Sequence, residues 1–280
     1  HLEYVVEHLN ESQRDDVRLL KKFLKAQKLY GADSRANGFS GYLCELLIIK
    51  YNSFANLLAH AIQWERGVII EMNGDGKDFE DPLVVVDPVD PTRNVASAVS
   101  LSTFSRFIEA ARAVSETKDV RMFSGPKPGY QPIDAGTFIV IMFDIDVIEE
   151  VFYAQARKFV EHVVKECGDN GFTLFRHGVF SKGVMLDVEI DQLPVKEKHR
   201  GPPVEKYAHA EKFKQKHPDV FVEKDTLYTI RERKYVSIDD LINDIIVSQR
   251  GVGSSLKRAS IRILKGQEAV NAIEKEIIFF

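Results

Sequence analysis

Residues 18–47 read RLLKKFLKAQKLYGADSRANGFSGYLCELL, a pattern that predicts a helix, a bend and a second helix. In the first helix, apolar residues recur over 17–24 at the spacing of one helical face. A glycine ends this pattern near Tyr30. The glycine-punctuated bend at 37–41 then leads into a more apolar helix that begins near Leu43. The segment therefore predicts a helical N-terminal domain.

A cationic stripe accompanies the first helix. Its members fall at i, i+3, i+7 and i+10, on one side of the helix: Arg18, Lys21, Lys25 and Lys28. No Asp or Glu lies between residues 16 and 33 to neutralise them. Lysines over a bend, with Tyr30 at its start, suit an anion such as a triphosphate. A solvated basic face on an ordinary helix explains the same pattern, so both interpretations stay open.

Composition and charge exclude several classes of protein. The chain has 280 residues, two cysteines and a formal net charge of −4, so a nucleic-acid footprint must be a local patch. Cys44 lies in an apolar helix, which argues against a disulfide framework or a zinc site. No apolar run is long enough to span a bilayer, and a cytoplasmic location is the default expectation. The chain begins HLEYVVEHL, in mid-pattern and without Met, so we expect a fragment whose N-terminal part is missing or separately encoded.

A buried strand at 83–86 is followed by a loop at 87–94 that prolines hold in shape, with the sequence DPVDPTRN. Asn94 is expected to cap the following segment, and the next helix is expected to start near Ser102. The loop is either an ordinary turn or a rigid support that presents Arg93 to a base or a phosphate. The motif alone does not decide between them.

The second half predicts an α+β module. SGPKPGY at 124–130 is the best domain boundary, which gives domains 1–124 and 125–280. The first expected elements are a strand at 137–143, a helix capped by Asp146 that runs from 148 to near 168, and a hairpin of 172–180 and 184–190. A basic helix is expected after 201–203, and a strand pair at 221–230 and 234–236 follows it. The last expected element is a helix capped by Ser237. This order predicts a sheet covered by helices on one face.

Two basic stretches in this half are candidates for RNA contact. The stretch 248–266 contains no carboxylate, and its basic residues are expected on one side of a short helix, after glycines and serines whose N–H groups can meet phosphates: Arg250, Lys257, Arg258, Arg262 and Lys265. Pairing with acidic neighbours such as Glu268 is the alternative. The stretch 196–216 interleaves lysines with glutamates and is equally typical of a solvated face. Asp144 and Asp146 form a D-x-D pattern, but no Gly-Ser turn precedes it, and we predict no metal ligand there.

Three motifs in this order and spacing resemble the archaeal (class I) CCA-adding enzymes, which are tRNA nucleotidyltransferases of the polymerase β superfamily: KKFLKAQKLYGA, GFSGYLCELLI and VVDPVDPTRNVA. The resemblance covers nearly the whole chain and is strong up to about Val114. It implies a mixed fold: a mainly α-helical, poly(A) polymerase-like substrate-binding (neck) domain, and then an α+β tRNA-binding body and tail.

The resemblance also implies roles for particular residues. Lys21 and Tyr30 would bind the phosphates and sugar of the incoming nucleotide, Arg93 would read the base edge of CTP or ATP, and His1 would contact the nucleotide. The carboxylates that hold Mg²⁺ belong to a head domain that this sequence does not match. We therefore assign no catalytic or metal residue here and expect this chain alone to be inactive.

The implied RNA partner is the acceptor stem and T arm of tRNA, held through phosphates and 2′-hydroxyls. No membrane partner is expected, and a homodimer is left open. Two other readings remain: a poly(A) polymerase-related nucleotidyltransferase and a non-catalytic RNA-binding protein.

Overall fold

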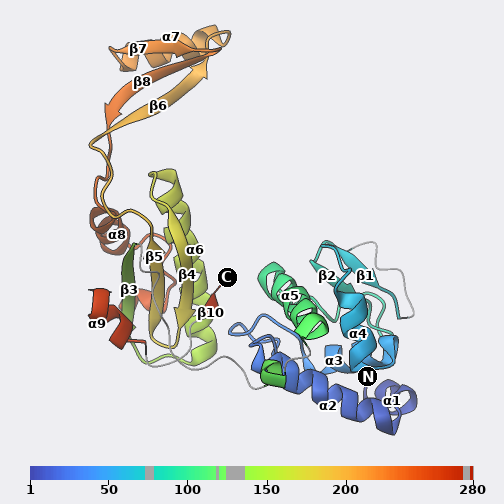
Figure 1. Cartoon of the computed structure of the whole chain (residues 1–280). Coiled ribbons are helices and arrows are strands. Elements are labelled where there is room, and N and C mark those ends of the chain that lie inside the picture. Colours follow the sequence, from blue (N-terminus) through green and yellow to red (C-terminus); the bar gives the residue numbers. More distant parts are fainter. Residues whose placement is uncertain (73–78, 118–119, 124–135, 274–277, 280) are drawn as a thin grey trace. The chain divides into compact units, whose positions relative to one another are not determined.

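The computed structural model of the chain describes most of its length: residues 1–72, 79–117, 120–123, 136–273 and 278–279. The turn expected at 73–76 and the linker expected at 124–130 lie outside these ranges. Contacts between Cα atoms divide the chain into two compact units (Figure 1). The first consists mainly of His1–Gly129 and includes Val147–Ala154; the second consists of Tyr130–Asp146 and Gln155–Phe279.

The first unit is mainly helical, as the sequence predicts. Its α-helices are α1 (Leu2–His8), α2 (Glu11–Ala26), α3 (Gly41–Tyr51), α4 (Phe54–Ala61) and α5 (Leu101–Thr117). Asn10 and Gln13 form a capping box at the start of α2. Ser40 and Ser53 cap α3 and α4 by accepting a backbone N–H bond. Buried aromatic rings such as Phe23 and Phe107 pack in the core between the helices.

Helix α2 ends at Ala26, earlier than the sequence predicts. Lys28 has a φ of 60° and lies outside the helix, so its place in the predicted stripe is wrong. The cause is a backbone connection between two buried residues. Phe39 N donates to Leu29 O at 2.8 Å, and both side chains are fully buried. The chain must turn before Leu29 for this connection to form.

A short parallel strand pair supports the loop that carries Arg93. Strand β1 (Val68–Ile70), which we did not predict, pairs with β2 (Leu83–Val85). The buried Asn94 side chain bonds β2 and the chain before it: its Oδ1 accepts from Val85 N at 2.9 Å, and its Nδ2 donates to Asp81 at 2.8 Å. Its Oδ1 also accepts from Ala96 N at 2.9 Å, so Asn94 caps the turn that follows, as predicted, and in addition fastens the loop to β2.

The second unit is built on an antiparallel sheet in the order β10-β4-β5-β3-β9. The strands are β3 (Thr137–Asp144), β4 (Leu174–Phe180), β5 (Gly183–Val188), β9 (Ser260–Lys265) and β10 (Ile278–Phe279), and the helices are α6 (Glu149–Asp169), α8 (Ile238–Val247) and α9 (Gly266–Asn271). The predicted hairpin and first strand are confirmed.

Helices cover both faces of this sheet. Phe143 on β3 contacts Phe159 on α6, whereas Val140 packs in a cluster with Ala269 of α9. The expectation of helices on one face is wrong, and the six consecutive buried residues of β3 show why: both of its faces are covered. Helix α6 begins at Glu149, and Phe152 N donates to Ile148 O. Ile148 therefore takes the cap position that we expected for Asp146.

A smaller sheet, β6-β8-β7, lies between β5 and α8 in the sequence (Figure 1). It consists of β6 (Lys196–Pro203), β7 (Val220–Glu223) and β8 (Thr226–Glu232), with α7 (Tyr207–Lys216) as its helix. The single strand predicted over 221–230 is wrong, since Lys224, at a φ of 56°, turns the chain between β7 and β8. Residues 234–236 form no strand. The chain enters and leaves this module side by side, with a bridge between Gln192 and Ser237.

Candidate functional site

The first turn of α3 brings two of the predicted nucleotide contacts together. A methyl group added at Gly41 would lie 3.3 Å from Tyr30 Oη and 3.6 Å from Lys21 Nζ. The Ser40 side chain accepts from Leu43 N, but the N–H groups of Gly41 and Tyr42 lie at positions where a helix supplies no acceptor. An ammonium, a hydroxyl and a helix N-terminus therefore meet at one point, which is suited to an anion.

Lys21 is held in place by an acidic partner. Its Nζ donates to Glu45 Oε1 at 2.9 Å, and both side chains are 26% exposed. Burial alone would lower the pKa of Lys21, but the hydrogen bond and charge of Glu45 outweigh it and raise this pKa above its ordinary value. Arg18 likewise pairs with Asp15. The stripe is therefore less free than its sequence indicates, because Glu45 reaches it from α3.

A second group of side chains meets at the buried carboxylate of Asp87. His1 Nε2 lies 2.9 Å from Asp87 Oδ2, and Tyr42 Oη donates to Oδ1 at 3.1 Å. Arg93 Nη1 lies 3.6 Å from Oδ2. Burial, together with the charge and the hydrogen bond of Asp87, raises the pKa of Tyr42, so its hydroxyl stays protonated.

The predicted nucleotide contacts thus form two pairs. Lys21 lies near Tyr30, and His1 lies near Arg93, and the two pairs meet consecutive residues of α3. Gly41 faces the first pair and Tyr42 contacts Asp87. Sequence reasoning missed four contributors to this arrangement, namely Gly41, Tyr42, Glu45 and Asp87. The available signal for Asp87 was a carboxylate directly after a buried strand.

An open cleft of about 610 Å³ lies beside this region, within the first unit. Its lining is mostly basic: Arg18, Lys21, Lys22, Lys25, Ala26 and Phe123. Lys22 was not singled out from the sequence. Several ammonium groups along one cleft can neutralise a run of phosphates.

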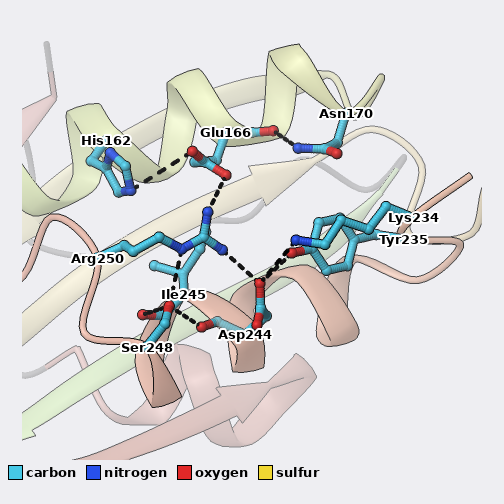
Figure 2. A network of polar contacts seen from close by, with 9 residues as sticks. All are labelled: His162, Glu166, Asn170, Lys234, Tyr235, Asp244, Ile245, Ser248 and Arg250. Atoms are coloured by element: carbon cyan, nitrogen blue, oxygen red, sulfur yellow. Dashed lines mark hydrogen bonds and ion pairs between the residues drawn. The ribbon is translucent and has the colours of Figure 1, made fainter.

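Arg250, which we predicted to contact RNA, forms ion pairs within the second unit (Figure 2). Its guanidinium bridges α6 and α8: Nη1 lies 2.9 Å from Glu166 and Nη2 lies 2.6 Å from Asp244. Lys265 is engaged in the same way, with Asp239 at 2.6 Å. The RNA contact predicted for both residues stays a prediction, and carboxylates on α6 and α8 pair with their cationic groups.

The remaining basic residues of this stretch do not share one helix. Lys257 and Arg258 lie in the 3₁₀ turn η2 (Leu256–Arg258), whereas Arg262 lies in β9, so the predicted short helix is wrong. The backbone N–H groups of Ser255 and Leu256 donate to Gln155 Oε1, which removes them as phosphate donors. Lys257, Arg258 and Arg262 are exposed, and within the described ranges no carboxylate pairs with them.

The β6-β8-β7 sheet carries a basic and aromatic face. Lys196, Lys198 and Arg200 alternate outward along β6. Lys198 Nζ lies 4.3 Å from the centre of the Tyr228 ring and 5.7 Å from that of Phe221, and it also bonds Glu223. The opposite face carries α7, through Phe213 stacked on His199.

Comparison with known proteins places these two units in one family. The family model for the second domain of tRNA nucleotidyltransferases matches residues 15–124, and the model for the C-terminal domain of CCA-adding enzymes matches residues 135–266. The chain belongs to the CCA-adding enzyme family. This confirms the resemblance read from the three motifs.

Individual CCA-adding enzymes align with most or all of the chain. The enzyme of Methanothermobacter thermautotrophicus is 34% identical over 303 residues, which cover 100% of this chain and 66% of the relative. That of Methanocaldococcus jannaschii is 34% identical and covers 88% of this chain and 59% of the relative. That of Halobacterium salinarum is 36% identical, with coverages of 78% and 52%. The chain thus spans between about half and two thirds of the length of these relatives.

Within the described ranges, no group of three or more His, Cys, Asp or Glu side chains is arranged to hold a metal ion. Among the helices of the same ranges, none is both long and apolar enough to cross a membrane.

Proposed function

We propose that the chain is the nucleotide- and tRNA-binding part of an enzyme that adds CCA, from CTP and ATP, to the 3′ end of tRNA. The observation that carries this proposal is the arrangement around the first turn of α3. Cationic, hydroxyl and guanidinium groups lie there at the positions that the family motifs mark, next to a helix N-terminus.

In this proposal, each group meets a different part of the nucleotide. Lys21 and the N-terminus of α3 neutralise the triphosphate, and the Tyr30 hydroxyl bonds a phosphate or the sugar. Arg93 is 54% exposed and offers a planar set of donors to a base edge. His1 lies beside it at Asp87 and contacts the nucleotide from the same side.

The proposed tRNA contacts are the exposed cations of the second unit. Lys257, Arg258 and Arg262 remain candidates for the phosphates of the acceptor stem and T arm. The outward residues of β6 join them, because lysine and arginine next to aromatic rings suit both phosphates and unpaired bases. Arg250 and Lys265 are weaker candidates, because carboxylates of the same unit already pair with them.

A divalent ion, Mg²⁺ in our proposal, would stabilise the charge that develops during nucleotidyl transfer. The described residues do not fit such an ion, since none of their donor groups forms a cluster suited to a metal. No step is therefore assigned to a metal held by these residues.

The test is a filter-binding titration of the chain with tRNA across salt concentrations, with calorimetry for CTP and ATP. Lys257→Glu/Arg258→Glu should weaken tRNA binding and lower the log–log salt slope by about 1.5 for two lost phosphate contacts. The control is Lys158→Glu/Lys165→Glu, which makes the same charge change at exposed positions of α6. This control variant should bind tRNA more tightly than Lys257→Glu/Arg258→Glu does.

The outcomes separate the alternatives. Equal losses of tRNA affinity in the two double variants would show that η2 makes no specific contact with tRNA. Binding of tRNA without binding of either nucleotide would favour a non-catalytic RNA-binding protein. Strong binding of ATP without CTP would favour a poly(A) polymerase-like enzyme.

A further inference from the structure

We propose that Asp87 is a positioning residue of the nucleotide site, and that its buried carboxylate sets the orientation of the Arg93 guanidinium and the His1 ring. This inference rests on the proposed function, and it concerns a residue that would not itself touch the nucleotide. It explains how two half-exposed side chains at the site can be held in one arrangement before a ligand binds.

The carboxylate of Asp87 is the buried centre of the arrangement. Its side chain is 0% exposed, whereas those of His1 and Arg93 are 46% and 54% exposed. Oδ1 accepts from Tyr42 Oη at 3.1 Å and from Val89 N at 3.0 Å. Oδ2 faces His1 Nε2 at 2.9 Å and Arg93 Nη1 at 3.6 Å. The buried negative charge is therefore surrounded by donors, as a carboxylate out of water requires.

The contacts come from separate elements of the unit. His1 precedes α1, Tyr42 lies in the first turn of α3, and Arg93 lies in the loop after β2. The main chain adds a further restraint, because Asp87 N donates to Arg93 O at 3.0 Å. Both the backbone and the guanidinium of Arg93 are thus tied to the same residue.

This arrangement has a chemical consequence for each exposed group. A carboxylate only accepts hydrogen bonds, so His1 donates from Nε2, and in the neutral ring Nδ1 is left as an acceptor. The charge of Asp87 attracts Nη1 of Arg93, and the other N–H groups of the guanidinium stay available for acceptors on a base. A ligand then meets a preorganised donor set and orders fewer side chains on binding.

A purely structural role predicts something different. The carboxylate could simply fasten the loop to α3, in which case its loss would weaken all ligands in parallel with stability. A positioning role predicts instead that recognition of the nucleoside falls while recognition of the bare phosphates is kept. Lys21 donates to Glu45, and α3 contacts Asp87 through the Tyr42 side chain, not through the backbone N–H groups that would meet a phosphate.

The experiment compares Asp87→Asn with Asp90→Asn in the 280-residue chain. Asp90 lies in the same loop, and its carboxylate bonds only exposed Thr92 groups among the described contacts. Calorimetry with CTP, ATP and inorganic triphosphate measures recognition. Asp87→Asn should weaken both nucleotides about tenfold and inorganic triphosphate less than about twofold, as expected for one lost charge-assisted bond. Asp90→Asn should change none of the three affinities.

A second readout needs no ligand. Nitrogen NMR of the His1 imidazole at alkaline pH reports which ring nitrogen carries the proton. The wild-type chain should show the Nε2–H tautomer, and Asp87→Asn should give a mixture of both. The NMR measurement tests the positioning role even if the chain binds no nucleotide. Absence of nucleotide binding would refute only the proposed function.

Two results would overturn the positioning role. One is an unchanged His1 tautomer with unchanged CTP affinity in Asp87→Asn. The other is a parallel loss of CTP, ATP and triphosphate binding. If Asp87→Asn does not fold, Tyr42→Phe removes one donor and leaves the charge. It should then weaken CTP about threefold and leave triphosphate binding unchanged, and equal losses for both ligands would refute the role.

Discussion

Replacing Gly41 by alanine should leave the fold intact and strongly weaken nucleotide binding. The added methyl group would lie 3.3 Å from Tyr30 Oη, a tight contact that a shift of the hydroxyl by a few tenths of an ångström relieves. Gly41 is the first residue of α3, and alanine gains up to about 1 kcal/mol over glycine within a helix. The free energy of unfolding should therefore change by less than about 1 kcal/mol in either direction.

The effect on the ligand should be larger. A phosphate oxygen must come within about 2.9 Å of an N–H or ammonium donor to form a hydrogen bond. The methyl group of alanine would lie 3.6 Å from Lys21 Nζ and occupy the space that such an oxygen needs. The loss of one or two charge-assisted bonds, at roughly 1.5–3 kcal/mol each, should weaken CTP and ATP by more than about tenfold.

The assay is calorimetric titration with each nucleotide, combined with urea denaturation. Gly168→Ala is the matched control, because Gly168 lies near the end of α6 and an added methyl group there meets nothing within 4 Å. It should have no effect on nucleotide affinity. If Gly41→Ala bound CTP and ATP as tightly as the control, the nucleotide would not approach the first turn of α3, and the proposed site would be wrong.

Four further changes probe the two units. Lys21→Ala should weaken CTP and ATP alike in calorimetry, because phosphates do not distinguish the bases, whereas Arg93→Ala should lower the preference for CTP over UTP by about 1–3 kcal/mol in competition binding. Arg250→Ala should lower the midpoint of thermal unfolding, since it breaks two ion pairs, and should leave tRNA retention on filters unchanged. Burial and nearby positive charge lower the pKa of His199, so the folded state favours the neutral ring. Stability should therefore fall as pH drops below about 6.5, where the unfolded chain takes up the proton, and His199→Gln should reduce that loss in urea titrations at several pH values.

Local patterns were sufficient where a few neighbouring residues determine the structure. Ser237 was predicted to cap a helix, and its side chain accepts from Asp239 N at the start of α8. The buried strand that begins at Leu83 was predicted from its run of apolar residues, and the hairpin of β4 and β5 was predicted from alternating residues. Strand β6 was missed because its alternating residues are nearly all charged, so no apolar face marks it.

The candidate sites needed information that is distant in the sequence. The stretch 248–266 contains no carboxylate, yet Arg250 pairs with Glu166, which lies 84 positions away. Lys21 pairs with Glu45 for the same reason, since packing of α2 on α3 brings them together. The loop that begins with Asp87 was left open between an ordinary turn and a rigid support for Arg93, and only the fold shows that Asp87 contacts side chains from three parts of the unit.

The side-by-side entry and exit of the β6-β8-β7 module make this part of the chain separable from the main sheet. Leu193 N donates to Val236 O and Arg233 N donates to Val195 O, both at 2.8 Å, so the two connecting segments are joined before the module begins. A folded insertion whose ends lie together can lengthen, shorten or be exchanged without displacing the strands on either side of it. The basic and aromatic face of this module can therefore diversify during evolution, or be grafted by design, while the sheet of β3, β4 and β5 keeps its register.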